Sequence, residues 1–129
     1  MTRYLLDTTA LIDFSKDREP ARSRIIEMIE NGDELALCAV NVAEFFSGVP
    51  LAQRPVWDEF IDSLGYWAIG RETARVAGHF RYDFARRGKV LSTTDALIAA
   101  VAQEKEAAIV TNNVKDYPMD GVRLLPLKE

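Results

Sequence analysis

Short apolar runs alternate along the chain with longer amphipathic stretches. The runs are rich in Leu, Val and Ile and lack a polar alternation, which is typical of strands covered on both faces. Such runs occupy residues 3–7, 34–40, 66–69, 108–110 and 122–125. The pattern therefore predicts a sheet of short strands.

The stretches between these runs have apolar residues at the three- to four-residue spacing of helices that bury one face. Pro20 opens one of them, Gly88 ends another, and Ser92 is a strong N-cap residue for a third. We expect Asn41 to cap the helix after the second strand, which places Glu44 in its first turn. The predicted helices cover residues 10–14, 20–30, 41–48, 51–64 (with a break or fresh start at Pro55), 71–87 and a segment beginning at 92.

Strand followed by helix, repeated along the chain, predicts an α/β fold with a mainly parallel sheet covered by helices. The length suits a single domain over residues 1–129. In such a sheet the carboxyl ends of the strands and the amino ends of the helices meet at one edge, where ligands usually bind.

Acidic residues gather at this edge from distant parts of the sequence. Asp7 ends the first strand, Glu44 follows the second, Asp95 follows Ser92 in a helix start, and Asp116 follows the strand at 108–110. Only the fold can bring these four residues together.

Each acid also has a purely local explanation. Asp7 can cap the short helix that follows it, and Asn41-x-x-Glu44 and Ser92-x-x-Asp95 match the capping-box pattern. A carboxylate in a first helical turn gains about 0.3–1 kcal/mol from the helix dipole. For each acid taken singly, helix capping is as good an explanation as a role in a functional site.

Taken together, clustered carboxylates repel one another unless a cation neutralises them. A hard cation with oxygen ligands, Mg²⁺ or Mn²⁺, suits such a cluster. Zinc does not, because His79 and Cys38 are the sole histidine and cysteine of the chain and belong to different elements. A carboxylate–metal site favours phosphoryl chemistry, in which the metal activates water and stabilises the leaving oxygen.

The sequence has no motif for nucleophilic catalysis or nucleotide binding, and none for secretion or membrane insertion. It holds no Ser-His-Asp or Cys-His set and no glycine-rich phosphate loop. A net charge of −4 argues against broad capture of nucleic acid, so a nuclease of this charge needs bases at the rim of its site. We see no signal peptide or membrane-spanning run, and expect a cytoplasmic protein.

Four segments resemble the PIN-domain ribonucleases, specifically the VapC-type toxins of toxin–antitoxin pairs. They are LLDTTALIDF, NVAEFFSG, ARRGKVLSTTDALIAAVAQEK and AIVTNNVKDYP, in this order over nearly the whole chain. The resemblance implies a Rossmann-like α/β/α sandwich and Mg²⁺-dependent cleavage of RNA, with Mn²⁺ as a substitute.

The resemblance also implies roles for particular residues. Asp7 and Asp95 match the two aspartates that hold the metal most directly, and Glu44 matches the acid on the helix after the second strand. For the fourth position the resemblance leaves Asn112, Asn113 and Asp116 open, and we expect Asp116 to be an outer contributor to the acidic site. The expected water or phosphate contacts are Thr8, Thr9, Thr94 and Asn112.

The same family resemblance implies partners. Members usually form homodimers, and each pairs with a small VapB-type antitoxin whose C-terminal segment crosses the active-site groove. DNA is bound only through that antitoxin. Arg86, Arg87 and Lys89, just before the Asp95 helix, are candidate phosphate contacts at the rim, or simply bases that complement the end of a helix.

Other interpretations stay open. A housekeeping PIN nuclease would have the same acids, and an antitoxin reading frame just upstream would distinguish the toxin from it. A binding module that lost catalysis is disfavoured by the presence of Asp7, Glu44 and Asp95. A haloacid-dehalogenase-like phosphatase needs a second Asp where this chain has Thr9, and a phospho-receiver domain needs paired acids at the first strand.

Overall fold

A parallel sheet of five strands runs through the middle of the molecule, with the order β3-β2-β1-β4-β5 and every pairing parallel. The computed structural model describes residues 2–128, so Met1 and Glu129 of the predicted 1–129 domain lie outside the described residues. The strands are β1 (Arg3–Leu6), β2 (Glu34–Leu37), β3 (Gly65–Tyr66), β4 (Ala108–Thr111) and β5 (Arg123–Pro126). The predicted α/β class is confirmed.

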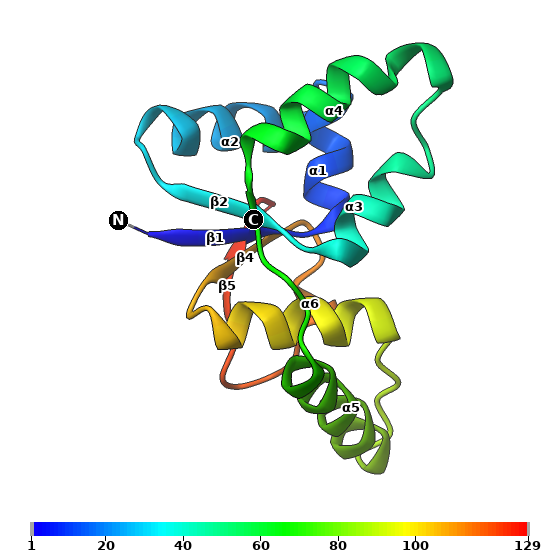
Figure 1. Cartoon of the computed structure of the whole chain (residues 1–129). Helices are drawn as coiled ribbons and strands as arrows, with labels where there is room; N and C mark the ends of the chain where they lie inside the picture. Colours follow the sequence, from blue (N-terminus) through cyan, green and yellow to red (C-terminus); the bar gives the residue numbers. More distant parts are fainter. Residues whose placement is uncertain (1, 129) are drawn as a thin grey trace.

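Helices cover both faces of the sheet and complete an α/β/α sandwich (Figure 1). One layer contains α1 (Thr8–Ser15), α2 (Ala21–Glu30), α3 (Ala39–Phe46) and α4 (Arg54–Ser63). The other contains α5 (Arg71–Arg86) and α6 (Thr93–Glu104). Two short 3-10 turns, η1 (Leu51–Gln53) and η2 (Val114–Asp116), lie in the connections. Among residues 2–128, no helix has the length and apolar character that crossing a membrane requires.

The two faces of the central strands feed two separate cores. In β1, Leu5 packs toward α6 and its neighbour Leu6 packs toward α1 and α2. In β4, Ile109 and Val110 divide in the same way. Because each of these four side chains is fully buried, each contributes roughly 1.5–3 kcal/mol of hydrophobic stabilisation. Neighbouring apolar residues of a strand thus pack on opposite faces of the sheet, one against each helical layer.

Asn41 is not the N-cap that the sequence led us to expect. The second strand stops at Leu37, and Cys38 caps α3 instead. Asn41 lies in the first turn, fully buried, where its Oδ1 accepts from the Cys38 N–H at 2.6 Å and its Nδ2 donates to the Leu6 carbonyl at 2.9 Å. The amide side chain therefore ties β1 to α3, and Glu44 moves from the expected first turn into the second.

The other predicted boundaries differ mainly at the edge of the sheet. The third strand keeps two residues instead of residues 66–69, because after the Trp67 N–H donates to the Leu37 carbonyl the chain leaves the sheet for α5. The break expected at Pro55 is present: η1 ends at Gln53, and Pro55 lies in the first turn of α4, where a missing N–H is tolerated.

Candidate active site

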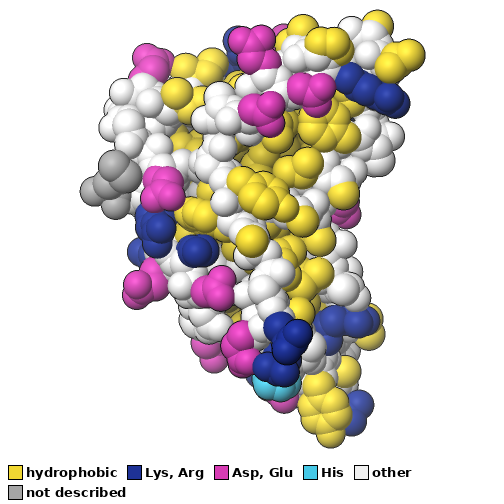
Figure 2. Space-filling view, viewed as in Figure 1, with side chains coloured by type: hydrophobic (Ala, Val, Ile, Leu, Met, Phe, Trp, Pro, Cys, Tyr) yellow, Lys and Arg dark blue, Asp and Glu magenta, His cyan; other side chains and the backbone are white. Residues whose placement is uncertain are grey.

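Four carboxylates from four separate segments of the chain line one pocket of about 320 Å³ at the carboxyl edge of the sheet. Asp7 follows β1, Glu44 belongs to α3, Asp95 to α6 and Asp116 to η2. The rest of the lining is Thr8, Thr9, Ser92, Thr94, Ile98 and Tyr117. On this side, where α3 and the start of α6 lie in Figure 1, the surface is notched between the two helical layers (Figure 2). The structure thus brings the four acids together.

Asp7 is the most enclosed of the four, with only 2% of its surface exposed. Its backbone N–H donates to the Val110 carbonyl at 3.1 Å, which continues the β1–β4 pairing by one residue. Its Oδ1 accepts from the Ala10 N–H at 2.8 Å and from the Thr9 hydroxyl at 2.9 Å. Asp7 therefore caps α1, as the sequence allowed. Its side chain also lines the pocket.

Burial raises the pKa of the Asp7 carboxyl above its ordinary value. Hydrogen bonds oppose that rise, the largest of them from the Thr111 hydroxyl, followed by those from Ala10, Thr9 and Tyr117. Within residues 2–128, no lysine, arginine or histidine lines the pocket, and none of the ion pairs there involves its four acids. The charge of this site is unbalanced.

Glu44 reaches the pocket from the second turn of α3. Its Oε1 accepts from the Thr8 hydroxyl at 2.6 Å, a contact that joins α3 to the start of α1. Because Glu44 is not in the first turn, the capping-box explanation does not apply to it. Its carboxylate is held instead by a residue 36 positions away.

Asp95 lies in the first turn of α6, behind the N-cap Ser92, whose hydroxyl accepts from the Asp95 N–H at 3.0 Å. Partial burial raises the pKa of the Asp95 carboxyl, and the Ser92 hydroxyl opposes the rise. The negative charges of Asp116, Asp7 and Glu44 raise the pKa further. The Asp95 carboxylate is therefore repelled by the other three acids of the pocket.

The remaining predicted contacts divide into two sets. Thr8, Thr9 and Thr94 line the pocket, although the hydroxyls of Thr8 and Thr9 bind the carboxylates themselves. Asn112 does not line it: its Nδ2 donates to Asp13 Oδ2 at 2.6 Å, and its Oδ1 is buried without a partner among residues 2–128.

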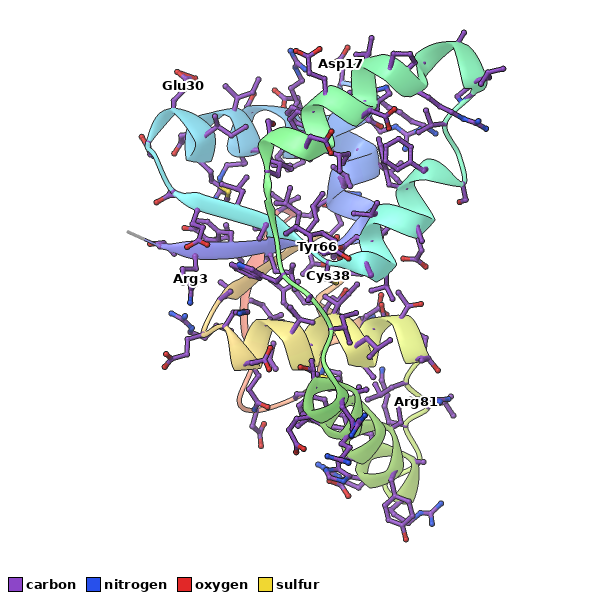
Figure 3. All side chains as sticks on the ribbon, in the orientation of Figure 1. Arg3, Asp17, Glu30, Cys38, Tyr66 and Arg81 are labelled. Atoms are coloured by element: carbon purple, nitrogen blue, oxygen red, sulfur yellow. The ribbon has the colours of Figure 1, made fainter. Side chains whose placement is uncertain are left out.

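The basic rim residues also lie outside the pocket lining. The Arg86 guanidinium stacks over the ring of Tyr82 at 4.5 Å, and that of Arg87 over Phe84 at 4.2 Å. With Lys89 they are exposed at the end of α5. Arg81, labelled in Figure 3, turns back to bind the Leu91 carbonyl at 3.0 Å and so braces the segment that leads into α6.

Sequence reasoning overlooked Thr111 and Tyr117. The sequence pattern marks Thr111 only as the end of a strand, yet the residue is fully buried beside Asp7. Tyr117 is 3% exposed, and its hydroxyl lies 3.4 Å from Asp7 Oδ2. Its position directly after Asp116, as an aromatic residue with a polar tip, was the available signal.

The donor set suits a hard cation that keeps much of its water. Among residues 2–128, no three side chains of Asp, Glu, His or Cys stand together as a preformed metal cage. Mg²⁺ does not require such a cage, because it commonly binds through one or two carboxylates and retains several waters. A partly open pocket with unbalanced carboxylates and hydroxyls fits that mode.

Comparison with known sequences shows the family of the chain. The sequence profile of the PIN domain matches residues 4–116. Ribonuclease VapC19 of Mycobacterium tuberculosis is 30% identical over 117 residues, which cover 89% of this chain and 92% of that protein. The tRNA(fMet)-specific endonuclease VapC of Shigella flexneri is 26% identical, with 94% of both chains covered.

Solved structures show the same fold. A chain of the VapBC2 complex of Rickettsia felis, bound to a fragment of promoter DNA, superposes with a TM-score of 0.83 at 20% identity, over 98% of this chain and all of that one. VapBC-1 of nontypeable Haemophilus influenzae gives 0.82 at 20% identity, over 99% and 100%. The chain therefore belongs to the PIN domain family and, within it, to the group of VapC proteins.

Proposed function

We propose that the protein is a metal-dependent endoribonuclease, the toxin of a type II toxin–antitoxin pair that acts on RNA in the cytoplasm. The observation that carries this proposal is the meeting of Asp7, Glu44, Asp95 and Asp116 in one pocket that holds no basic side chain among its lining residues. The relatives named ribonuclease and tRNA(fMet)-specific endonuclease support the same activity.

Asp7 and Asp95 would hold the cation, Mg²⁺ or in its place Mn²⁺, most directly, and Glu44 would contribute to the same site through a retained water. When bound, the metal supplies water of lowered pKa and charge stabilisation for the leaving oxygen. The burial that raises the pKa of Asp7 and Asp95 makes their negative charge costly without a cation. The same burial strengthens their attraction to a cation.

The side chains around the acids set their geometry. Thr9 and the amino end of α1 fix one oxygen of Asp7, and Thr8 fixes one oxygen of Glu44. Asp116 and Thr94 also line the pocket, where the Asp116 carboxylate would accept a proton from water and the Thr94 hydroxyl would donate to the phosphate. The in-line attack of water on the phosphate would then depend on these acids and hydroxyls, which the fold holds in place. The proposed contribution of the protein to the rate is therefore chiefly the positioning of the reacting groups.

The basic residues at the end of α5 would serve the RNA rather than the reaction. Arg86, Arg87 and Lys89 are exposed and follow one another closely in the sequence. Their charges lie on the segment that leads into the Asp95 helix, outside the acid pocket. Contacts of this kind bind phosphates without reading sequence and weaken as salt rises.

A second pocket adjoins the first and suits the antitoxin. It measures about 210 Å³, shares Glu44 with the acid pocket, and includes Ile12, Phe45, Val49 and Trp57 in its lining. We propose that the C-terminal segment of a VapB-type antitoxin places an apolar side chain here and a basic one among the acids. Charge complementarity favours this occupant, since the acid pocket offers carboxylates without a counter-ion.

A homodimer is the proposed assembly. Apolar side chains spread over the face around β3 in Figure 2, and Tyr66, labelled in Figure 3, is 60% exposed there. The two-residue strand β3 leaves that edge of the sheet short. Replacing Tyr66 with Lys should convert a dimer measured by light scattering into a monomer.

The decisive experiment is cleavage of RNA by the purified chain freed of antitoxin. Cleavage is expected in Mg²⁺ or Mn²⁺ and should disappear in excess EDTA and in Asp7→Asn and Asp95→Asn, while circular dichroism shows an intact fold. Equal cleavage in EDTA would overturn the metal mechanism. A housekeeping nuclease would cleave RNA too, but its gene would lack an upstream antitoxin frame whose product inhibits the enzyme.

A further inference from the structure

The two oxygens of the Asp7 carboxylate have different surroundings. Oδ1 accepts from the Ala10 N–H and the Thr9 hydroxyl and is committed to the cap of α1. Oδ2 lies 3.4 Å from the hydroxyl of Tyr117. The Thr111 hydroxyl also acts on this carboxylate. Because Oδ2 takes no part in the cap of α1, it is the oxygen better placed to bind a cation.

The ring of Tyr117 packs in the core, and its hydroxyl is the part of the side chain that reaches Asp7 in the pocket. Its side chain is 3% exposed and packs in the core that contains Ile98 and Met119. Its backbone N–H donates to the Val114 carbonyl at 3.1 Å, at the end of η2. A ring held in this way delivers a hydroxyl at little cost in conformational entropy.

We propose that Tyr117 is a positioning residue: its hydroxyl orients Asp7 Oδ2 toward the pocket and thereby sets the affinity of the site for a divalent metal. The inference rests on the proposed function, because it assumes that Asp7 holds the metal. Tyr117 itself touches no reacting atom in this scheme.

The phenol is the donor of this hydrogen bond, because the ionised Asp7 carboxylate can only accept. The 3.4 Å separation is longer than the roughly 2.7 Å of an ordinary hydroxyl–oxygen bond. Hydrogen bonds of active sites commonly shorten when the ligand binds, so this bond strengthens when the carboxylate is fully ionised beside a cation.

The test compares Tyr117→Phe, which removes only the oxygen, with Tyr4→Phe. Tyr4 lies on β1 and packs in the opposite core. Mn²⁺ binding is titrated by the electron paramagnetic resonance signal of the free ion, with no RNA present. Partners of metal ligands typically contribute a factor of about 10–100, and the long separation places Tyr117→Phe near a tenfold higher Kd, with Tyr4→Phe unchanged.

An unchanged Kd for Tyr117→Phe would overturn the inference while leaving the metal site in place. A wild-type chain that binds no Mn²⁺ would overturn the proposed function, and this inference with it. The two failures are therefore distinguishable.

A second readout separates positioning from a direct role in the reaction. Tyr117→Phe should cleave RNA about tenfold more slowly at low Mn²⁺ and recover the wild-type rate at saturating Mn²⁺. A deficit that persists at saturation would assign the hydroxyl to the water or the phosphate and overturn the inference. So would a large decrease in the Tm of the metal-free variant, which would make the role structural.

Discussion

Thr8 donates its hydroxyl hydrogen to Glu44 Oε1 across 2.6 Å, although 36 residues separate the two in sequence. Thr8 begins α1 and Glu44 lies in the second turn of α3. The next residue, Thr9, does the same for Asp7 within its own turn. Two adjacent hydroxyls thus hold two acids of one pocket, one locally and one through the tertiary structure.

Removing the Thr8 hydroxyl should loosen Glu44 and slow the reaction. We expect Thr8→Val to lower the rate of RNA cleavage about tenfold, the lower end for partners of metal ligands. Thr8→Ser keeps the hydroxyl and should stay close to wild type. Since Thr8 is only partly buried, the Tm of both variants should change little. Equal rates for the Val and Ser variants would show that the hydrogen bond has no functional weight.

Asp7→Asn should stabilise the metal-free protein while abolishing activity. Because burial raises the pKa of Asp7, the folded state binds its proton more tightly than the unfolded state. The protonated Asp7 carboxyl therefore stabilises the folded state. This stabilisation is fully present below pH 3.8, the ordinary pKa of the group, and is lost as pH rises through the higher pKa of the folded state. Asn removes the charge but keeps an oxygen to cap α1.

The measurement is thermal melting in EDTA. At pH 7 the Tm of Asp7→Asn should exceed that of the wild type, by roughly 3–5 °C for each 1 kcal/mol gained in a domain of this size. The difference should shrink at pH 4. Asp62→Asn, on the exposed side of α4, is the matched control and should leave the Tm unchanged. A lower Tm for Asp7→Asn at pH 7 would contradict the prediction.

Divalent metal should stabilise the fold because it relieves repulsion among the acids. At 100 times its Kd a ligand that binds only the folded state adds about 2.7 kcal/mol, a Tm increase of roughly 10 °C. Mg²⁺ or Mn²⁺ should give this increase in the wild type, and NaCl of equal ionic strength should not. Asp95→Asn should respond less. If wild type and variant respond alike, the cation binds elsewhere.

Arg86→Gln with Arg87→Gln should weaken RNA binding without impairing the reaction itself. We expect a several-fold rise in KM and little change in kcat. The salt dependence of log Kd should become shallower by about 1 for each phosphate that the protein no longer binds. The control pair is Lys105→Gln with Arg123→Gln, which removes the same charge near the starts of β4 and β5, at the other edge of the sheet. Equal effects of both pairs would point to net charge rather than a rim.

Asn41 and Glu44 illustrate where sequence reasoning reached its limit. The motif Asn-x-x-Glu matches a capping box, so the local pattern placed Asn41 outside the helix. In the structure Cys38 takes that place, because the Asn41 amide can satisfy both the Cys38 N–H and the Leu6 carbonyl of the neighbouring strand. That second partner belongs to another part of the chain, and no local pattern contains it.

Asn112 and Tyr117 show the same limit at the other end of the site. Both follow β4, and the family resemblance assigned to Asn112 the contact with water or phosphate. The turn instead directs Asn112 to Asp13 and brings Tyr117 beside Asp7. Which side of a turn faces the pocket depends on the packing of α1 and of the core around α6, and neither is encoded within the turn.

The sequence by itself determined the alternation of strands and helices, the parallel sheet, and the edge where Asp7, Glu44, Asp95 and Asp116 gather. These follow from periodicity and from the handedness of strand crossovers, which are properties of short segments. The tertiary structure alone decided the burial of Asp7, the tether from Thr8 to Glu44 and the approach of Tyr117. Those features depend on contacts between segments 36 to 110 residues apart, which exist only once both helical layers have packed on the sheet.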